Sequence, residues 1–230
     1  MKKSIFALTV AASLGLAAVS QAQAATQTFT QSHAVGQTNW TDVLGLGKFD
    51  SNLGTLTSIK FNLGGLVQGT GKAESLDSAA SNVILNLAAL LTLTRPDATT
   101  LVVSNPLFTQ NFAFSAFDGG YDFAGTSGGS TGVRSSTGSN AFTSHSATDF
   151  ALFSSVGGGL INLGLNAVGS SNASGAGNLI SQFNTAAGAD VSVTYEYISA
   201  VPEPETYVML LTGLALAGVM ARRKSAKAKA

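Results

Sequence analysis

A hydrophobic period of two residues runs through the middle of this chain. It is clearest in residues 190–197, where Val191, Val193, Tyr195 and Tyr197 occupy every second position between polar residues. Successive side chains of a β-strand point to opposite faces, so these four side chains would share one face. The residue types are those that suit a pleated, half-buried surface. The pattern predicts strands at residues 26–32, 56–63, 85–94, 100–103, 110–117, 147–153, 160–167 and 190–199.

Helical patterns are scarce between these strands. Residues 78–91 are compatible with a helix at their start, but strands within residues 83–94 fit better, with Arg95-Pro96-Asp97 as a turn. Residues 176–187 are compatible with one short helix. Many short strands and turn signals without alternating helices predict an all-β fold, an antiparallel β-sandwich or jelly-roll-like body.

The N-terminus carries the pattern of a secretory signal peptide. Lys2 and Lys3 precede an apolar run at residues 5–19, and Ala22-Gln23-Ala24 is a small-x-small cleavage site. We therefore assign residues 1–24 to a signal peptide that engages the Sec translocon and is removed by signal peptidase. The mature chain would begin near Ala25, and residues 25–200 would form one folded domain.

The C-terminal residues 201–230 contain three blocks in a fixed order. Pro202, Glu203 and Pro204 form a rigid joint, an apolar run follows at residues 206–221, and a basic cluster of Arg222, Arg223 and Lys224 comes last. Such cations stay on the cytoplasmic side of a membrane. As a helix, the sixteen apolar residues would span about 24 Å, less than the ~30 Å hydrocarbon core. The run therefore predicts one short transmembrane helix, either in a removable sorting tail or in a plain membrane anchor.

This tail resembles the PEP-CTERM sorting signal of bacteria, through the tripeptide Pro202-Glu203-Pro204, the run at residues 209–218 and the basic cluster. The resemblance implies that an exosortase, a membrane-embedded cysteine transpeptidase, cuts near the tripeptide. The precursor would be tethered to the inner membrane, and the processed body would reach the cell surface or the extracellular matrix. Cargo of this kind is associated with exopolysaccharide and biofilm.

The body also resembles choice-of-anchor E domains, over about residues 42–197. The resemblance rests on residues 46–50, 53–59, 116–128, 149–153 and 187–197. That family takes its name from its varied C-terminal anchoring devices and implies no established activity.

The charge of the mature body differs from that of the whole chain, which is zero. Residues 25–201 contain five Lys and Arg against ten Asp and Glu, a net charge of −5. A sparsely charged acidic surface without basic clusters argues against nucleic-acid binding. The chain has no cysteine, which excludes disulfides and a catalytic thiol.

Three short motifs suggest chemistry that their context does not support. Residues 125–129 match G-x-S-x-G, but no helix pattern follows Ser127, and His145 precedes Asp149 rather than following it. Gly71-Lys72 lacks the first glycine and the Ser or Thr of a P-loop. Gly45-Leu46-Gly47 lacks the third glycine of a dinucleotide site, and we assign it to a turn. We expect no catalytic residues and no obligatory cofactor.

Two weaker binding candidates remain. Asp118 and Asp122 flank Gly119-Gly120, which would let both carboxylates face one Ca²⁺; the alternative is a turn whose aspartates cap the loop. Trp40, the only tryptophan, would stack on a sugar ring or seal the edge of the core.

These features predict a non-enzymatic exported protein that an exosortase processes and that operates in a surface or exopolysaccharide matrix. A secreted carbohydrate- or Ca²⁺-binding module is the alternative, and a secreted hydrolase built on Ser127 is the third possibility.

Overall fold

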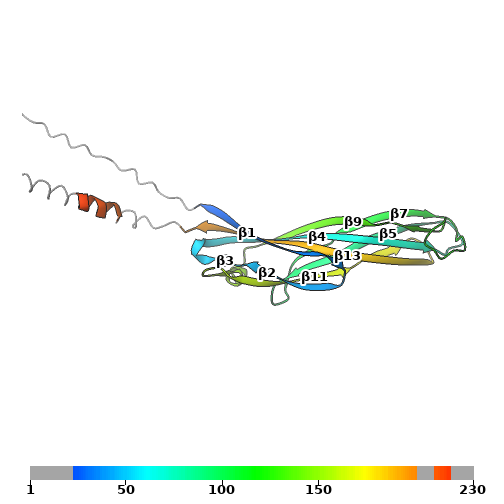
Figure 1. Cartoon of the computed structure of the whole chain (residues 1–230), viewed down its shortest axis with the longest axis horizontal. Coiled ribbons are helices and arrows are strands. Elements are labelled where there is room, and N and C mark those ends of the chain that lie inside the picture. Colours follow the sequence, from blue (N-terminus) through cyan, green and yellow to red (C-terminus); the bar gives the residue numbers. More distant parts are fainter. Residues whose placement is uncertain (1–22, 201–209, 219–230) are drawn as a thin grey trace, which may run out of the picture. The chain divides into compact units, whose positions relative to one another are not determined.

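Two long strands, β4 (Gly54–Ser75) and β13 (Leu179–Ser199), run side by side through the folded body in Figure 1. They pair antiparallel from Gly54 opposite Ser199 to Ser75 opposite Leu179, with one irregularity between Glu196 and Tyr197. The computed structural model describes residues 23–200 and 210–218 of the chain. Ala24–Ser199 form one unit, and the sheets described below belong to it.

The first sheet is built on this pair. β1 (Ala24–Gln37) lies beside β13, and β8 (Gly128–Ser130) and β9 (Arg134–Ser144) pair with β4. All of these pairs are antiparallel.

The second sheet is organised around β5 (Ser81–Thr94). β5 pairs antiparallel with β6 (Thr100–Ser104), β7 (Leu107–Phe114), β11 (Leu160–Gly169) and β12 (Asn172–Ser174), and β11 also pairs with β2 (Trp40–Gly47). Two short elements, β3 (Phe49–Asp50) and β10 (Ser154–Ser155), pair in parallel, and a 3-10 turn, η1 (Ser51–Leu53), follows β3.

The main core lies between the inner faces of the two sheets. The first sheet contributes Phe61, Val193 and Tyr195, and the second contributes Leu91 and Leu163, all fully buried. The Tyr195 hydroxyl donates a hydrogen bond to the Gly47 carbonyl oxygen at 2.8 Å, and burial raises the pKa of this phenol. The hydrophobic period of two thus arises because each of the two sheets buries one of its faces.

Most of the predicted strands are confirmed. Those at residues 26–32, 56–63, 85–94, 100–103, 160–167 and 190–199 lie within β1, β4, β5, β6, β11 and β13, and the strand at 110–117 overlaps β7. The fold is mostly antiparallel β-structure, as the sequence predicted, whereas a jelly-roll likeness stays a prediction. The assignment of Gly45-Leu46-Gly47 to a turn was wrong, because these residues lie in β2.

The strand predicted at residues 147–153 was wrong, because this segment forms the helix α1 (Ala147–Phe153). Ser146 caps its N-terminus by accepting a hydrogen bond from the Thr148 amide. Asp149, in the first turn, is buried, where it lies 2.9 Å from the Arg95 guanidinium and accepts a hydrogen bond from Ser144. Phe153 packs edge-on against Phe61. A helix cap and a buried ion pair, rather than hydrophobic periodicity, determine the secondary structure of residues 147–153.

The short helix considered for residues 176–187 was also wrong. β13 begins at Leu179 and continues without a break to Ser199. Each residue from Leu179 onward pairs with one on β4, beginning with Leu179 opposite Ser75. The inter-strand hydrogen bonds along β4 therefore outweigh the local helical pattern.

The predicted C-terminal helix is described in part. Residues 210–218 are helical, while the rest of the apolar run at 206–221 lies outside the described residues. Among the described residues, no helix has the length and apolar character needed to cross a membrane.

The Asp149 ion pair generates a stability prediction. Replacing Asp149 by Ala leaves the largely buried Arg95 guanidinium without its carboxylate, and breaking such a pair costs about 3 kcal/mol or more. We expect the D149A variant to lose about this much free energy of unfolding in urea titrations. The control is Asp190→Ala, on an exposed strand position, which should change stability by less than about 0.5 kcal/mol. Equal losses in the two variants would contradict the role of the ion pair.

Candidate functional site

The two ends of the folded body lie next to each other. Ala24, the last residue of the proposed signal-cleavage site, opens β1 and pairs with Ile198 of β13. β13 ends at Ser199, just before the tail. The other residues of the processing signals lie outside the described residues; they are Ala22, Pro202, Glu203, Pro204, Arg222, Arg223 and Lys224. The body therefore begins and ends on neighbouring strands of one sheet.

The opposite end of β4 carries a long loop at residues 115–127, here called the distal loop. β4 covers about 70 Å at about 3.3 Å per residue, so the distal loop is far from Ala24 and Ser199. The two ends of the loop are close together, because the Ser115 amide donates to the Thr126 carbonyl oxygen at 2.8 Å. Compact surface loops of this kind often carry function.

Asp118 holds the distal loop in shape. Its Oδ1 accepts a hydrogen bond from the Gly120 amide at 3.0 Å, and its Oδ2 accepts one from the Thr126 amide at 3.1 Å. The backbone donors of Gly120 and Thr126 lower the pKa of the Asp118 carboxyl. Gly125 has a φ of 70°, and a Cβ atom there would collide with Asp118 Oδ2. A glycine is therefore required beside this carboxylate.

Asp122 faces the same glycine as Asp118. A Cβ atom built on Gly120 would lie 3.5 Å from Asp118 Oδ1 and 3.6 Å from Asp122 Oδ2. The structure therefore brings together the two carboxylates that the sequence singled out. Within the described part of the chain, however, no group of three or more His, Cys, Asp or Glu residues could hold a metal ion. Both aspartates also cap the loop, since Asp122 Oδ1 accepts from the Ala124 amide at 2.9 Å.

Ser127, the serine of the hydrolase-like motif, is fully buried. Its hydroxyl donates to Glu74 Oε1 at 2.6 Å and accepts from the Asp118 amide. His145 lies beside Thr57, whose carbonyl oxygen is 3.1 Å from the imidazole. Positions 57 and 74 of β4 are about 55 Å apart at about 3.3 Å per residue. Ser127 therefore fixes the distal loop to β4 and cannot share a catalytic site with His145.

Trp40 lies at the edge of the main core. Its indole Nε1 donates to the Ala187 carbonyl oxygen at 3.1 Å, and its ring stacks on His33 with centroids 3.8 Å apart. His33 is held in turn by Asp42 at 2.7 Å. With His33 over the indole and the core beside it, the ring has the placement expected of a residue that seals the edge.

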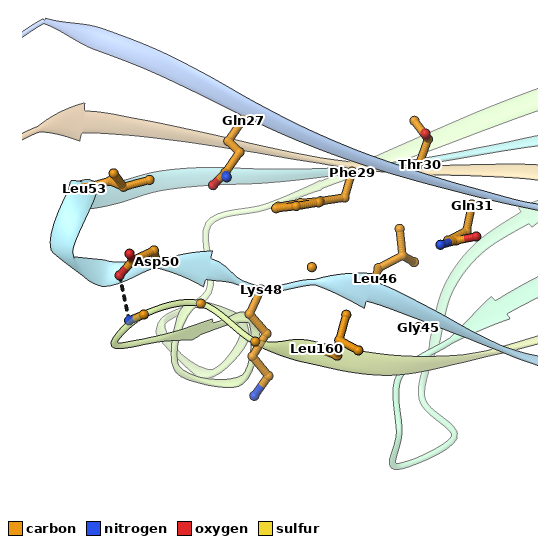
Figure 2. A pocket seen from close by; sticks show the side chains of 14 residues that line it. Gln27, Phe29, Thr30, Gln31, Gly45, Leu46, Lys48, Asp50, Leu53 and Leu160 are labelled. Atoms are coloured by element: carbon orange, nitrogen blue, oxygen red, sulfur yellow. Dashed lines mark hydrogen bonds between the residues drawn. The ribbon is translucent and has the colours of Figure 1, made fainter.

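A slot of about 480 Å³ opens between β1 and the segment from β2 to η1. In Figure 2, Gln27 and Phe29 reach into it from β1, Leu46 faces them from β2, and the Lys48 amine points away. Gln27 Oε1 is buried without a hydrogen-bond partner among the described residues. Sequence patterns missed this slot and the Glu74–Ser127 contact, because each joins segments far apart in the chain.

Comparison with known proteins identifies the C-terminal tail. Residues 200–224 match the PEP-CTERM protein-sorting motif. The motif implies an exported protein with a membrane-anchored precursor that an exosortase processes. The match begins one residue after the end of β13 and does not include the body.

For the body, no curated protein matches the chain. Among solved structures, the VP2 subviral particle of infectious bursal disease virus matches with 14% identity over 86% of this chain, with a TM-score of 0.19. The structure of the Gx strain of that virus matches with 11% identity over 79% of this chain, with a TM-score of 0.16. The chain spans 49% and 38% of those two proteins. Likenesses at this level carry no argument about function.

The low pKa of Asp118 predicts how acid affects the distal loop. Because the folded-state pKa lies below the unfolded value of about 3.9, the carboxylate stabilises the fold above that pH. This contribution is lost as the pH falls through the folded-state pKa. We expect Asp118→Asn to lower the melting temperature at pH 7, and the difference from the native chain to shrink below about pH 3.9. A difference that is constant down to pH 2 would show that the charge of Asp118 plays no part.

Proposed function

We propose that this chain is a non-enzymatic bacterial surface or matrix protein, with a choice-of-anchor E type body that operates in association with exopolysaccharide. The N-terminal signal peptide directs export through the Sec translocon, and the tail holds the precursor in the inner membrane until exosortase acts. The observation that carries this proposal is the position of the sorting motif. It begins at residue 200, immediately after the last strand of the body.

The position of the core supports separate roles for the body and the sorting tail. The buried core residues of the described chain all come from β1 to β13 and the segments between them. A cut near Pro202-Glu203-Pro204 would therefore leave the body intact. The burial of Ser127 and its hydrogen bond to Glu74 support a non-enzymatic role, since they give this serine a structural function.

Removing residues 202–230 tests the sorting role. We expect the truncated protein to be exported but no longer held at the membrane or processed, so cell fractionation should find it in a different compartment from the native protein. A matched control deletes only residues 225–230, which lie beyond the matched motif, and should fractionate like the native chain. Unchanged fractionation of the longer deletion would contradict the proposal.

Mass spectrometry of the native protein separates this proposal from a plain anchor. The proposed processing predicts a mass running from about Ala25 to the Pro202-Glu203-Pro204 joint. An intact tail through Ala230 would favour the permanent anchor instead.

A Ca²⁺-binding body is the second candidate, because Asp118 and Asp122 face the same side of Gly120. A ligand that binds only the folded state stabilises it by about 2.7 kcal/mol at one hundred times its Kd. If the distal loop binds Ca²⁺, millimolar CaCl₂ should raise the melting temperature of the native chain and not that of Asp118→Asn. Asp97→Asn, in an exposed turn elsewhere, is the matched control and should respond like the native chain. Absence of heat and of a melting shift in the native chain would remove this candidate.

A further inference from the structure

The outer face of the first sheet carries rows of short polar side chains. We call it the hydroxyl face and define it by Thr28, Thr30 and Ser32 on β1, Ser192 and Thr194 on β13, and Asn62 on β4. Thr28 lies opposite Thr194, and Thr30 lies opposite Ser192, which lies opposite Asn62. The alternate residues of β4 and β13, such as Phe61 and Val193, are buried in the core. The face is therefore fixed in position by the strands that build the fold.

The side chains of the hydroxyl face are regularly spaced and partly ordered. Neighbouring strands lie about 4.8 Å apart, and every second residue of a strand is about 6.6 Å from the last. The Thr28 and Thr194 hydroxyls are hydrogen-bonded to each other at 2.9 Å. Short side chains lose little conformational entropy when a ligand binds, unlike Lys or Gln. The result is a repeating set of hydrogen-bond donors and acceptors.

A hollow of about 340 Å³ lies on this face, toward its Ser32 end. Thr30, Ser32, Asn62, Asp190 and Ser192 contribute to its lining. Gly64 pairs with Asp190 between these strands. A Cβ atom on Gly64 would approach no atom more closely than 3.7 Å. The face therefore stays open at Gly64, and a larger side chain would fit there without disturbing the core.

The charge of this face argues for an uncharged ligand. Four rows cross β1, β13 and β4, from Thr26, Glu196 and Ser58 to Ser32, Asp190 and Gly64. Their charged side chains are Lys60, Asp190 and Glu196, a net charge of −1. The mature body is itself net −5, so an anionic polymer would be repelled. Serine is depleted at protein–protein interfaces relative to the rest of the surface, which makes a protein partner a poor fit.

We propose that the hydroxyl face binds a neutral, extended polysaccharide, with the hollow beside Gly64 receiving one sugar unit. Repeated hydroxyls along such a polymer match the repeated donors and acceptors of the sheet, and several weak contacts on one chain add to its retention. This inference deepens the proposed matrix role and names the surface that carries it.

Affinity electrophoresis of the body (residues 25–199), whose core is complete without the tail, tests the proposal. The gels contain either neutral hydroxyethylcellulose or anionic alginate. We expect retardation by hydroxyethylcellulose alone, with little dependence on salt because no charges are paired. Gly64→Gln places a longer side chain beside the hollow, opposite Asp190, and should raise the apparent Kd for hydroxyethylcellulose about tenfold, equivalent to about 1.4 kcal/mol.

The matched control is Gly45→Gln on β2, in the second sheet, where a Cβ atom has similar room, with its nearest contact at 3.7 Å. It should be retarded like the native body, and the melting temperatures of both variants should confirm that they fold. Three outcomes would overturn the proposal. The first is no retardation by hydroxyethylcellulose, and the second is a preference for alginate that salt abolishes. The third is a loss of retardation caused by Gly45→Gln and not by Gly64→Gln, which would point to the slot beside β1 that Gly45 lines. None of these would affect the sorting role, which the tail deletion tests in cells.

Discussion

The antiparallel pairing of β4 with β13 is the constraint on which the rest of the fold depends. It joins residues more than one hundred positions apart along the whole length of both strands. A slip of one residue would turn Phe61, Val193 and Tyr195 out of the core and expose them to water. The pairing therefore sets the register of the first sheet, and β1 and β9 add to strands whose inner and outer faces are already decided. Its length separates Ala24 and Ser199, which lie next to the two proposed cuts, from the distal loop.

Without cysteine, this exported body depends on its packed core and on polar groups that are paired locally. Asp149 with Arg95 and Ser144 holds α1 against the sheets, and Glu74 with Ser127 holds the distal loop against β4. Ser144 lies on β9 and Glu74 on β4, so each set of contacts joins a non-strand segment to a strand, while Arg95 lies just after β5. Breaking the Asp149 contacts should also disturb the main core, because α1 contributes the buried Phe153 to it, whereas the Glu74–Ser127 contact holds a loop that contributes no residue to that core.

Secondary structure was predictable where the local sequence pattern is strong. Alternation located β5, β11 and the last part of β13 because each buries one face of a sheet. It failed for α1, where a Ser146 cap and a buried Asp149 decide the structure, and for residues 176–187, where pairing with β4 overrides a local helical pattern. β9 was missed because its sequence, rich in Ser, Gly and Thr, has no apolar period; it is a strand because β4 offers it eleven paired positions. The closeness of Asp118 to Asp122 was predictable from the glycines between them, whereas the partner of Ser127 lies 53 residues away and left no local signal.

The pairing of Ala24 with Ile198 brings together the ends of the two strands that lead to the proposed cuts. β1 begins and β13 ends at the same end of the first sheet, and neither proposed cut would remove a residue of the core. The strands that carry the body surface are therefore the same before and after the two proposed cuts. A binding role for the body should accordingly be sought along the sheet or at the distal loop, away from the end where the tail departs. The hydroxyl face meets this condition, because Thr30, Asn62 and Ser192 lie on strand positions that the core holds in place before and after processing.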